Sequence, residues 1–135
     1  YDVIIVPPWV ILDNIIIDIF INIRSMMEMD FNTISHYFEL IHNTTSQNGY
    51  FVNVNRYLKN TSGFDNKLGE YPYDQNWSVI SSKKSEFQPH IHQLITKRTN
   101  KRNKSITEEL KKIINFTDNN RKFVLAGKKD IFKNT

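Results

Sequence analysis

The sequence predicts an α/β fold with a mostly parallel sheet, and three consecutive segments carry this prediction. The run 15–23 is rich in isoleucine, which is typical of a buried parallel strand. From residue 31 apolar side chains repeat at helical spacing, and 50–57 returns to a strand-like pattern. We therefore expect strands 17–23 and 50–56 to be parallel neighbours, joined by a helix over 31–43 through a right-handed crossover.

A shorter apolar run precedes these segments. Val3 to Val6 is rich in β-branched residues, and Pro7 and Pro8 end it because proline cannot donate a hydrogen bond to a β ladder. The segment between the two apolar runs is too short for a helical crossover, which takes a dozen or more residues. We expect the strands at 3–6 and 15–23 not to be neighbours.

The helix has clear end signals. Asp30 or Asn32 is expected to cap its amino end, because both side chains accept hydrogen bonds from free backbone N–H groups. We place its end between residues 42 and 44, and "SQNG" at 46–49 is expected to form a turn before the next strand.

The second part of the chain is more irregular. Residues 58–76 show no period and are rich in Gly, Asn and Asp, which predicts a long loop of the kind that forms lids or binding sites. Residues 77–82 and 89–98 are expected to form an antiparallel hairpin, although the second stretch also fits a short helix. Ser105 and Glu108 form a capping-box pattern before a C-terminal helix. We divide the chain at 1–104 and 105–135.

Composition narrows the classes of function. The 135 residues suit one domain, and the lack of cysteine leaves no disulfide framework or thiolate metal site. No apolar stretch is long enough to span a membrane and no basic segment precedes the first run, so we expect a cytoplasmic protein.

Charge is divided unevenly along the chain. Residues 1–55 carry a net charge of −5 and residues 56–135 carry +9, with the densest basic run at 97–104. This run predicts either a solvated basic turn or contact with phosphate groups. The run has no interleaved aromatic residue to stack on bases, which disfavours nucleic acid. A basic binding module for nucleic acid or acidic glycan is therefore the alternative function.

Four stretches carry a family resemblance: "PPW" at 7–9, "DIFINIRSMMEM" at 18–29, "GYFVNVNRY" at 49–57 and "FQPHIHQLITKR" at 87–98. In this order they resemble the second half of a class I S-adenosylmethionine-dependent methyltransferase. More narrowly, they resemble sugar O-methyltransferases of bacterial polysaccharide biosynthesis. The resemblance implies a partial Rossmann-like sheet with an antiparallel C-terminal hairpin, S-adenosylmethionine as cofactor, and methyl transfer to a sugar hydroxyl of a polysaccharide precursor.

One part of the family pattern is not in this sequence. The glycine-rich loop and the ribose-binding acid are missing, and the four glycines include no G-x-G pair. The resemblance therefore implies that the chain is the C-terminal half of the enzyme and that the N-terminal half of the same domain is its partner. An unpaired sheet edge would then remain, which predicts self-association of the free chain unless Val3 to Val6 folds back to cover that edge.

The resemblance implies cofactor contacts around two loops. Trp9 is expected either to wall the adenine pocket or to cap the core. Asn22, Arg24 and Ser25 lie at the carboxyl end of a predicted strand, where open α/β sheets bind ligands.

Substrate and proton-transfer roles are expected at the same edge. Asn55, Arg56 and Tyr57 end the next strand and are candidates for substrate binding. Glu28 is the nearest acid and is expected either to be the general base or to favour the amino end of the helix.

Two histidines are further candidates. His90 and His92 would face the same way on a strand, as a catalytic pair or as an exposed pair. No third ligand is linked to them by the sequence, so we predict no metal site.

Overall fold

The computed structural model describes residue 5 and residues 14–61, 63–101 and 104–126. Trp9 and the predicted strand Val3 to Val6, apart from the exposed Ile5, lie outside the described residues. None of the described helices is long and apolar enough to cross a membrane.

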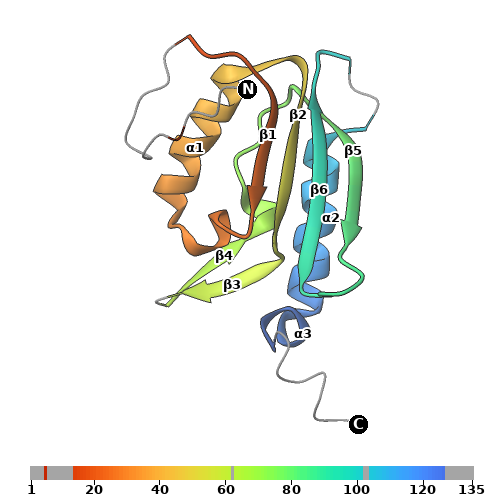
Figure 1. The fold of residues 1–135 in the computed structure, drawn as a ribbon. Helices are drawn as coiled ribbons and strands as arrows, with labels where there is room; N and C mark the ends of the chain where they lie inside the picture. Colours follow the sequence, from red (N-terminus) through yellow and green to blue (C-terminus); the bar gives the residue numbers. More distant parts are fainter. Residues whose placement is uncertain (1–4, 6–13, 62, 102–103, 127–135) are drawn as a thin grey trace.

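A four-stranded mixed sheet organises the described chain. Its strands are β1 (Ile17–Ile23), β2 (Thr45–Arg56), β5 (Trp77–Lys84) and β6 (Ile91–Arg98), in the spatial order β1-β2-β6-β5 (Figure 1). β1 and β2 are parallel neighbours, and the hairpin β5–β6 is antiparallel, so both of these predictions are confirmed. The prediction of a mostly parallel sheet is wrong for the described strands, because β6 also pairs antiparallel with β2. Among the described residues no α-helix connects β2 to the β5–β6 hairpin, and the chain returns in the opposite direction.

The parallel pair is joined by α1 (Phe31–Thr44). The Asp30 carboxylate accepts a hydrogen bond from the Thr33 N–H at 2.7 Å, which confirms the expected cap. The helix also ends where the sequence predicts. The chain then enters β2 directly at Thr45, so the predicted turn at 46–49 is wrong.

A bulge takes the place of that turn. Ile17 pairs with Thr45 while Ile19 pairs with Tyr50, so the β2 side of the ladder contains extra residues. Asn48 adopts a left-handed backbone with φ 68° within this segment. Asparagine tolerates that conformation better than most residues, which explains why a turn-like sequence sits inside a strand.

Residues 58–76 contain more regular structure than the sequence predicts. β3 (Leu58–Thr61) and β4 (Phe64–Lys67) form a separate antiparallel hairpin, followed by the 3-10 helix η2 (Leu68–Glu70). Neither strand alternates apolar and polar residues, since each has one apolar residue followed by three polar ones, so the sequence shows no strand pattern there. A Cβ added to Gly69 would lie 2.5 Å from Cγ1 of Ile114, so η2 packs closely against the C-terminal helix.

The C-terminal part is helical, with α2 (Ile106–Asn119) followed by α3 (Arg121–Ala126). Ser105 caps α2 by accepting a hydrogen bond from the Glu108 N–H at 3.4 Å, as predicted.

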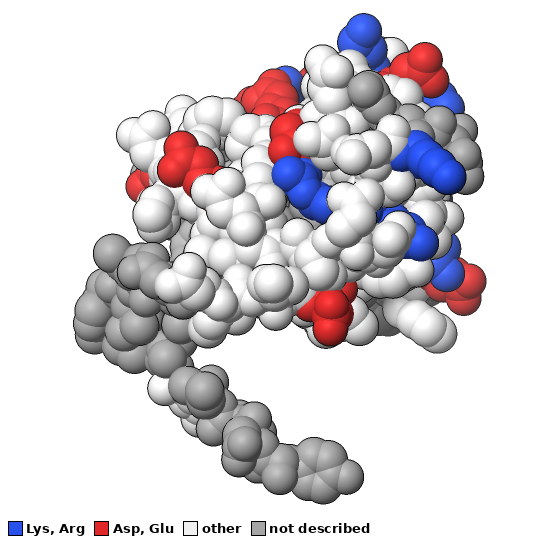
Figure 2. Space-filling view, turned by 90° about the horizontal axis from the view of Figure 1, so that it is seen from above, with Lys and Arg blue, Asp and Glu red and all other residues white. Residues whose placement is uncertain are grey.

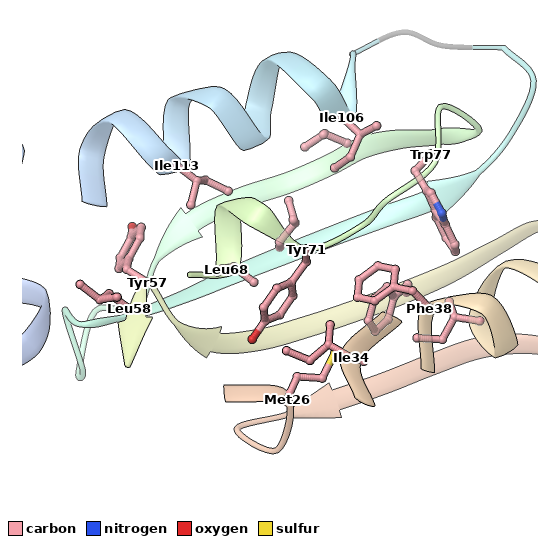
Figure 3. Packing of buried hydrophobic residues seen from close by; sticks show 14 of the residues in the cluster. Met26, Ile34, Phe38, Tyr57, Leu58, Leu68, Tyr71, Trp77, Ile106 and Ile113 are labelled. Atoms are coloured by element: carbon pink, nitrogen blue, oxygen red, sulfur yellow. The ribbon is translucent and has the colours of Figure 1, made fainter. Parts of the chain in front are cut away.

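One face of the sheet carries the core. Phe38 of α1 packs edge-to-face against Phe51 of β2, with ring centroids 5.7 Å apart. Ile106 and Ile113 of α2 point toward the same face beside η2 (Figure 3). Both helices therefore cover one side of the sheet, in two layers.

The opposite face is apolar and exposed. Ile19, Ile21 and Ile23 alternate along β1 away from the core, and their side chains are 58–60% exposed. Their β2 partners include Tyr50, which is 37% exposed. The expectation that β1 is a buried strand is wrong for the described chain, because β1 lies at the sheet edge with no described layer over its outer face.

Candidate functional site

The carboxyl ends of β1 and β2 hold a buried network of asparagine amides. Asn55 donates a hydrogen bond to the side-chain oxygen of Asn22 at 2.9 Å. The side-chain oxygen of Asn22 also accepts a hydrogen bond from the Met26 N–H at 3.3 Å. The side-chain oxygen of Asn55 accepts one from the Met27 N–H at 3.2 Å. These contacts fix the 3-10 helix η1 (Met26–Glu28) directly after β1. The sequence predicted that Asn22 and Asn55 lie on one rim, and the structure places their amides together.

Further amides extend this network. Asn66 of β4 donates to the carbonyl oxygens of Met26 and Met29, both at 2.9 Å, and accepts a bond from the Tyr71 hydroxyl at 2.9 Å. Asn53 donates to the Tyr73 hydroxyl at 3.1 Å. Sequence reasoning did not place Asn66 here, because only the β3–β4 hairpin brings it to η1. Paired in this way, the buried amides avoid the cost of unsatisfied polar groups.

Arg24 lies at the end of β1 in a strained backbone conformation. Its φ is 60°, a left-handed value that is rare for residues other than glycine, and its N–H donates to the Val54 carbonyl at 2.7 Å. Its guanidinium donates to the Gln88 side chain at 3.2 Å, across the end of β2. The exposed Ser25 accepts a hydrogen bond from Asn22. Strain of this kind is a pointer to function when it occurs in a candidate site.

Glu28 and Arg56 are held by different parts of the chain. Glu28 is half-exposed and forms an ion pair with Lys59 of β3. Arg56 donates to the backbone carbonyls of Val124 at 3.1 Å and Leu125 at 3.0 Å. Burial lowers the pKa of Arg56, and the nearby charge of Arg24 lowers it further against the opposing effect of Glu28. The three predicted charged residues therefore share one edge of the molecule.

His92 forms a second buried cluster beside this edge. One ring nitrogen, Nδ1, lies 2.8 Å from the Tyr57 hydroxyl and the other, Nε2, lies 2.8 Å from Oγ of Ser82. Burial lowers the pKa of His92 to about 4 and raises the pKa of Tyr57 to about 12. The imidazole is therefore neutral at pH 7, and both of its nitrogens have hydrogen-bond partners. In this arrangement His92 of β6 links Ser82 of β5 to Tyr57.

His90 does not share a strand face with His92. It precedes β6, and its carbonyl oxygen accepts a hydrogen bond from the Tyr57 N–H at 3.1 Å. Both histidines are buried, so the exposed-pair interpretation is wrong. Within the residues that the structure describes, no group of three or more His, Asp or Glu side chains gathers to hold a metal ion.

A separate shallow pocket lies between α1 and β4. Phe31, Phe64 and Glu70 contribute to its walls, and its cavity volume is only about 30 Å³. Typical small-molecule sites are larger, at roughly 300–1,000 Å³. The strand-end cluster is therefore the stronger candidate site.

The basic run at 97–104 is partly engaged within the chain. Lys97 lies over the Tyr50 ring, 5.6 Å from its centroid, and Arg98 pairs with Asp74 at 2.7 and 2.9 Å. Seen from the end of the molecule where β1 and β2 begin, basic side chains gather on one side with acidic side chains among them (Figure 2). On this face the basic side chains therefore do not form an unbroken positive surface.

Comparisons of this chain with protein-family models, curated proteins and solved structures found no match.

Proposed function

We propose that this chain is the C-terminal half of a class I S-adenosylmethionine-dependent O-methyltransferase that acts on a sugar hydroxyl. The observation that carries the proposal is the exposed outer face of β1, where Ile19, Ile21 and Ile23 are 58–60% exposed beside a free sheet edge. Strands in a parallel pair are normally covered on both faces. An N-terminal half that continues the sheet beyond β1 and adds a helical layer would cover these isoleucines.

The connectivity of the described sheet supports the same proposal. A parallel pair joined by α1 is followed by an antiparallel terminal hairpin, as the family resemblance implies. The charged candidates Arg24, Glu28 and Arg56 lie at the carboxyl ends of the parallel strands, which is where open α/β sheets bind their ligands.

The described residues do not fit the cofactor by themselves. The amides of Asn22 and Asn55, which the sequence suggested as ligand contacts, hold η1 instead. The sequence also lacks the glycine-rich loop. We therefore assign S-adenosylmethionine mainly to the N-terminal half and the acceptor side of the cleft to this chain.

This chain would then position the acceptor. Transfer of a methyl group to a hydroxyl depends mainly on the alignment of the reacting atoms, and a base that takes the hydroxyl proton adds to the rate. Glu28 is the carboxylate that follows β1 at this edge, and its ion pair with Lys59 fixes its orientation. In the proposal, Glu28 accepts the proton while Arg24 and Arg56 hold the acceptor.

Two measurements test the proposal. Calorimetric titration of the isolated chain with S-adenosylmethionine should give a dissociation constant weaker than the low micromolar range, which corresponds to about −8 kcal/mol. The chain joined to the polypeptide encoded directly upstream in the same reading frame should bind the cofactor and transfer labelled methyl groups to a sugar. Failure of the joined protein to bind S-adenosylmethionine would overturn the assignment.

A further inference from the structure

The arginines of the described chain fall into two pairs with different surroundings. Arg98 and Arg121 each form a two-pronged pair with an aspartate, at distances of 2.7 and 2.9 Å. For Arg24 and Arg56, no carboxylate of the described residues lies within 4.0 Å of the guanidinium group. Their hydrogen-bond acceptors are the neutral oxygens of Gln88 and of the α3 backbone.

The strand register places these two unneutralised arginines side by side. The Arg24 N–H binds the Val54 carbonyl, two residues before Arg56 in β2. Arg56 pairs with Ile91 of β6, whose N–H binds the Gln88 carbonyl at 2.8 Å. Because the Arg24 guanidinium reaches Gln88, it crosses the end of β2 beside Arg56.

The local charge at this edge is positive. Glu28 is the acid that acts on Arg56, and its carboxylate already pairs with Lys59. Lys84 lies one row away, because it pairs with His92, whose β2 partner is Asn55, and its side chain is exposed. Glu86 follows in the turn between β5 and β6 and is also exposed. Cations outnumber carboxylates here, and two guanidinium groups side by side repel each other unless an anion lies between them.

One donor of this cluster has no partner. Nε of Arg56 is buried and makes no hydrogen bond to the described residues. A buried donor without a partner costs free energy, and the guanidinium fork matches the oxygens of phosphate and carboxylate groups. Arg24 adds a strained backbone at the same point, which tertiary contacts must maintain.

We propose that Arg24 and Arg56 form an anion site, and that the sugar acceptor of the proposed methyltransferase carries a phosphate or carboxylate group that binds there. The anion site stands on the geometry of this chain alone, whereas its assignment to the acceptor rests on the proposed function. The acceptor class is thereby narrowed from any sugar to a sugar phosphate, including nucleotide-linked sugars, or a uronic acid.

The test is a calorimetric titration of the chain, without S-adenosylmethionine, at low salt. The probes are a hexose 1-phosphate, a hexuronate and the neutral hexose. We expect at least one anionic probe to bind at least about tenfold more tightly than the neutral hexose, the size of effect expected from one charge-assisted hydrogen bond. The preferred anionic probe identifies the phosphate or the carboxylate as the source.

Matched variants separate the site from general charge. Arg24→Gln should weaken binding of the preferred anion at least about tenfold, whereas Lys111→Gln, which removes the same charge from the exposed surface of α2, should change it less than twofold. Arg56→Lys, which keeps the charge but loses the fork, should also weaken binding. Circular dichroism confirms that each variant is folded, and the exposed Arg24 side chain makes loss of fold at that position the least expected.

Two results would overturn the anion site: equal binding of the neutral hexose, or equal effects of Arg24→Gln and Lys111→Gln. Because this assay omits the methyl donor, its failure is distinguishable from failure of the proposed function. Anion binding by a chain whose joined form transfers no methyl group would refute the methyltransferase proposal and leave the anion site intact.

Discussion

Acidification provides a direct test of the buried His92 cluster. The His92 side chain is 5% exposed and its ring nitrogens contact Tyr57 and Ser82 at 2.8 Å. Burial lowers its pKa from 6.5 to about 4, against the opposing effect of Glu109. Below pH 6.5 the unfolded chain therefore takes up a proton that the folded chain does not accept until about pH 4.

The sign and size of the effect follow from this difference. Stability is fully present above pH 6.5 and falls as the pH drops through the window from 6.5 to about 4. The complete loss from this one group is about 3 kcal/mol, and about 2 kcal/mol of it should be lost by pH 5. A loss of this size is a large part of the stability of a typical domain.

Urea unfolding followed by circular dichroism at pH 8, 6 and 5 measures the effect. The comparison that matters is the difference between the parent chain and His92→Gln, because carboxylates and the other histidines contribute equally to both curves. His36→Gln, on the exposed face of α1, is the control and should keep the full slope. A parent-minus-variant difference that changes by less than about 0.5 kcal/mol between pH 8 and pH 5 would refute the buried neutral histidine.

Three further predictions concern the network, the edge and the base. Asn55→Leu leaves the Met27 N–H without its acceptor and should lower the unfolding free energy measured in urea by roughly 1–3 kcal/mol. The control Asn32→Ala, at an exposed position, should change it by less than about 0.5 kcal/mol, and equal losses in the two variants would contradict the network. The free chain should self-associate through the β1 edge, as measured by light scattering, and Ile21→Lys should reduce this association without lowering the melting temperature. A monomeric parent chain would contradict the open edge. In the joined methyltransferase, Glu28→Gln should lower kcat by roughly 10² to 10⁴ with an unchanged melting temperature, and a kcat within about threefold of the parent would remove Glu28 as the base.

Local patterns in the sequence predicted the elements whose causes are local. The cap at Asp30 and the apolar repeat that follows it predicted α1, and Ser105 predicted the start of α2. The parallel pairing of β1 and β2 also followed from the order of strand, helix and strand. Arg24 and Arg56 were placed on one edge for the same reason, since the carboxyl ends of neighbouring parallel strands lie together.

In the candidate site, too, the sequence predicted which residues lie together but not which contacts they make. The sequence brought Asn22 and Asn55 to one rim, but it could not show that their amides hold η1, because that depends on where Met26 and Met27 turn after β1. Asn66 enters the cluster only through the β3–β4 hairpin, whose strands do not alternate apolar and polar residues and so leave no strand pattern in the sequence.

What the sequence by itself determined is therefore the set of local elements: the helix boundaries, the parallel pair and the charged residues that follow its strands. The tertiary structure alone decided that β6 lies between β2 and β5, that His92 is buried against Tyr57, and that one sheet face stays uncovered in the described chain. The physical reason is the sequence distance over which each interaction acts. Caps and periodicity act over a few neighbouring residues, whereas strand order and burial depend on contacts between segments far apart in the chain, which a local pattern does not encode.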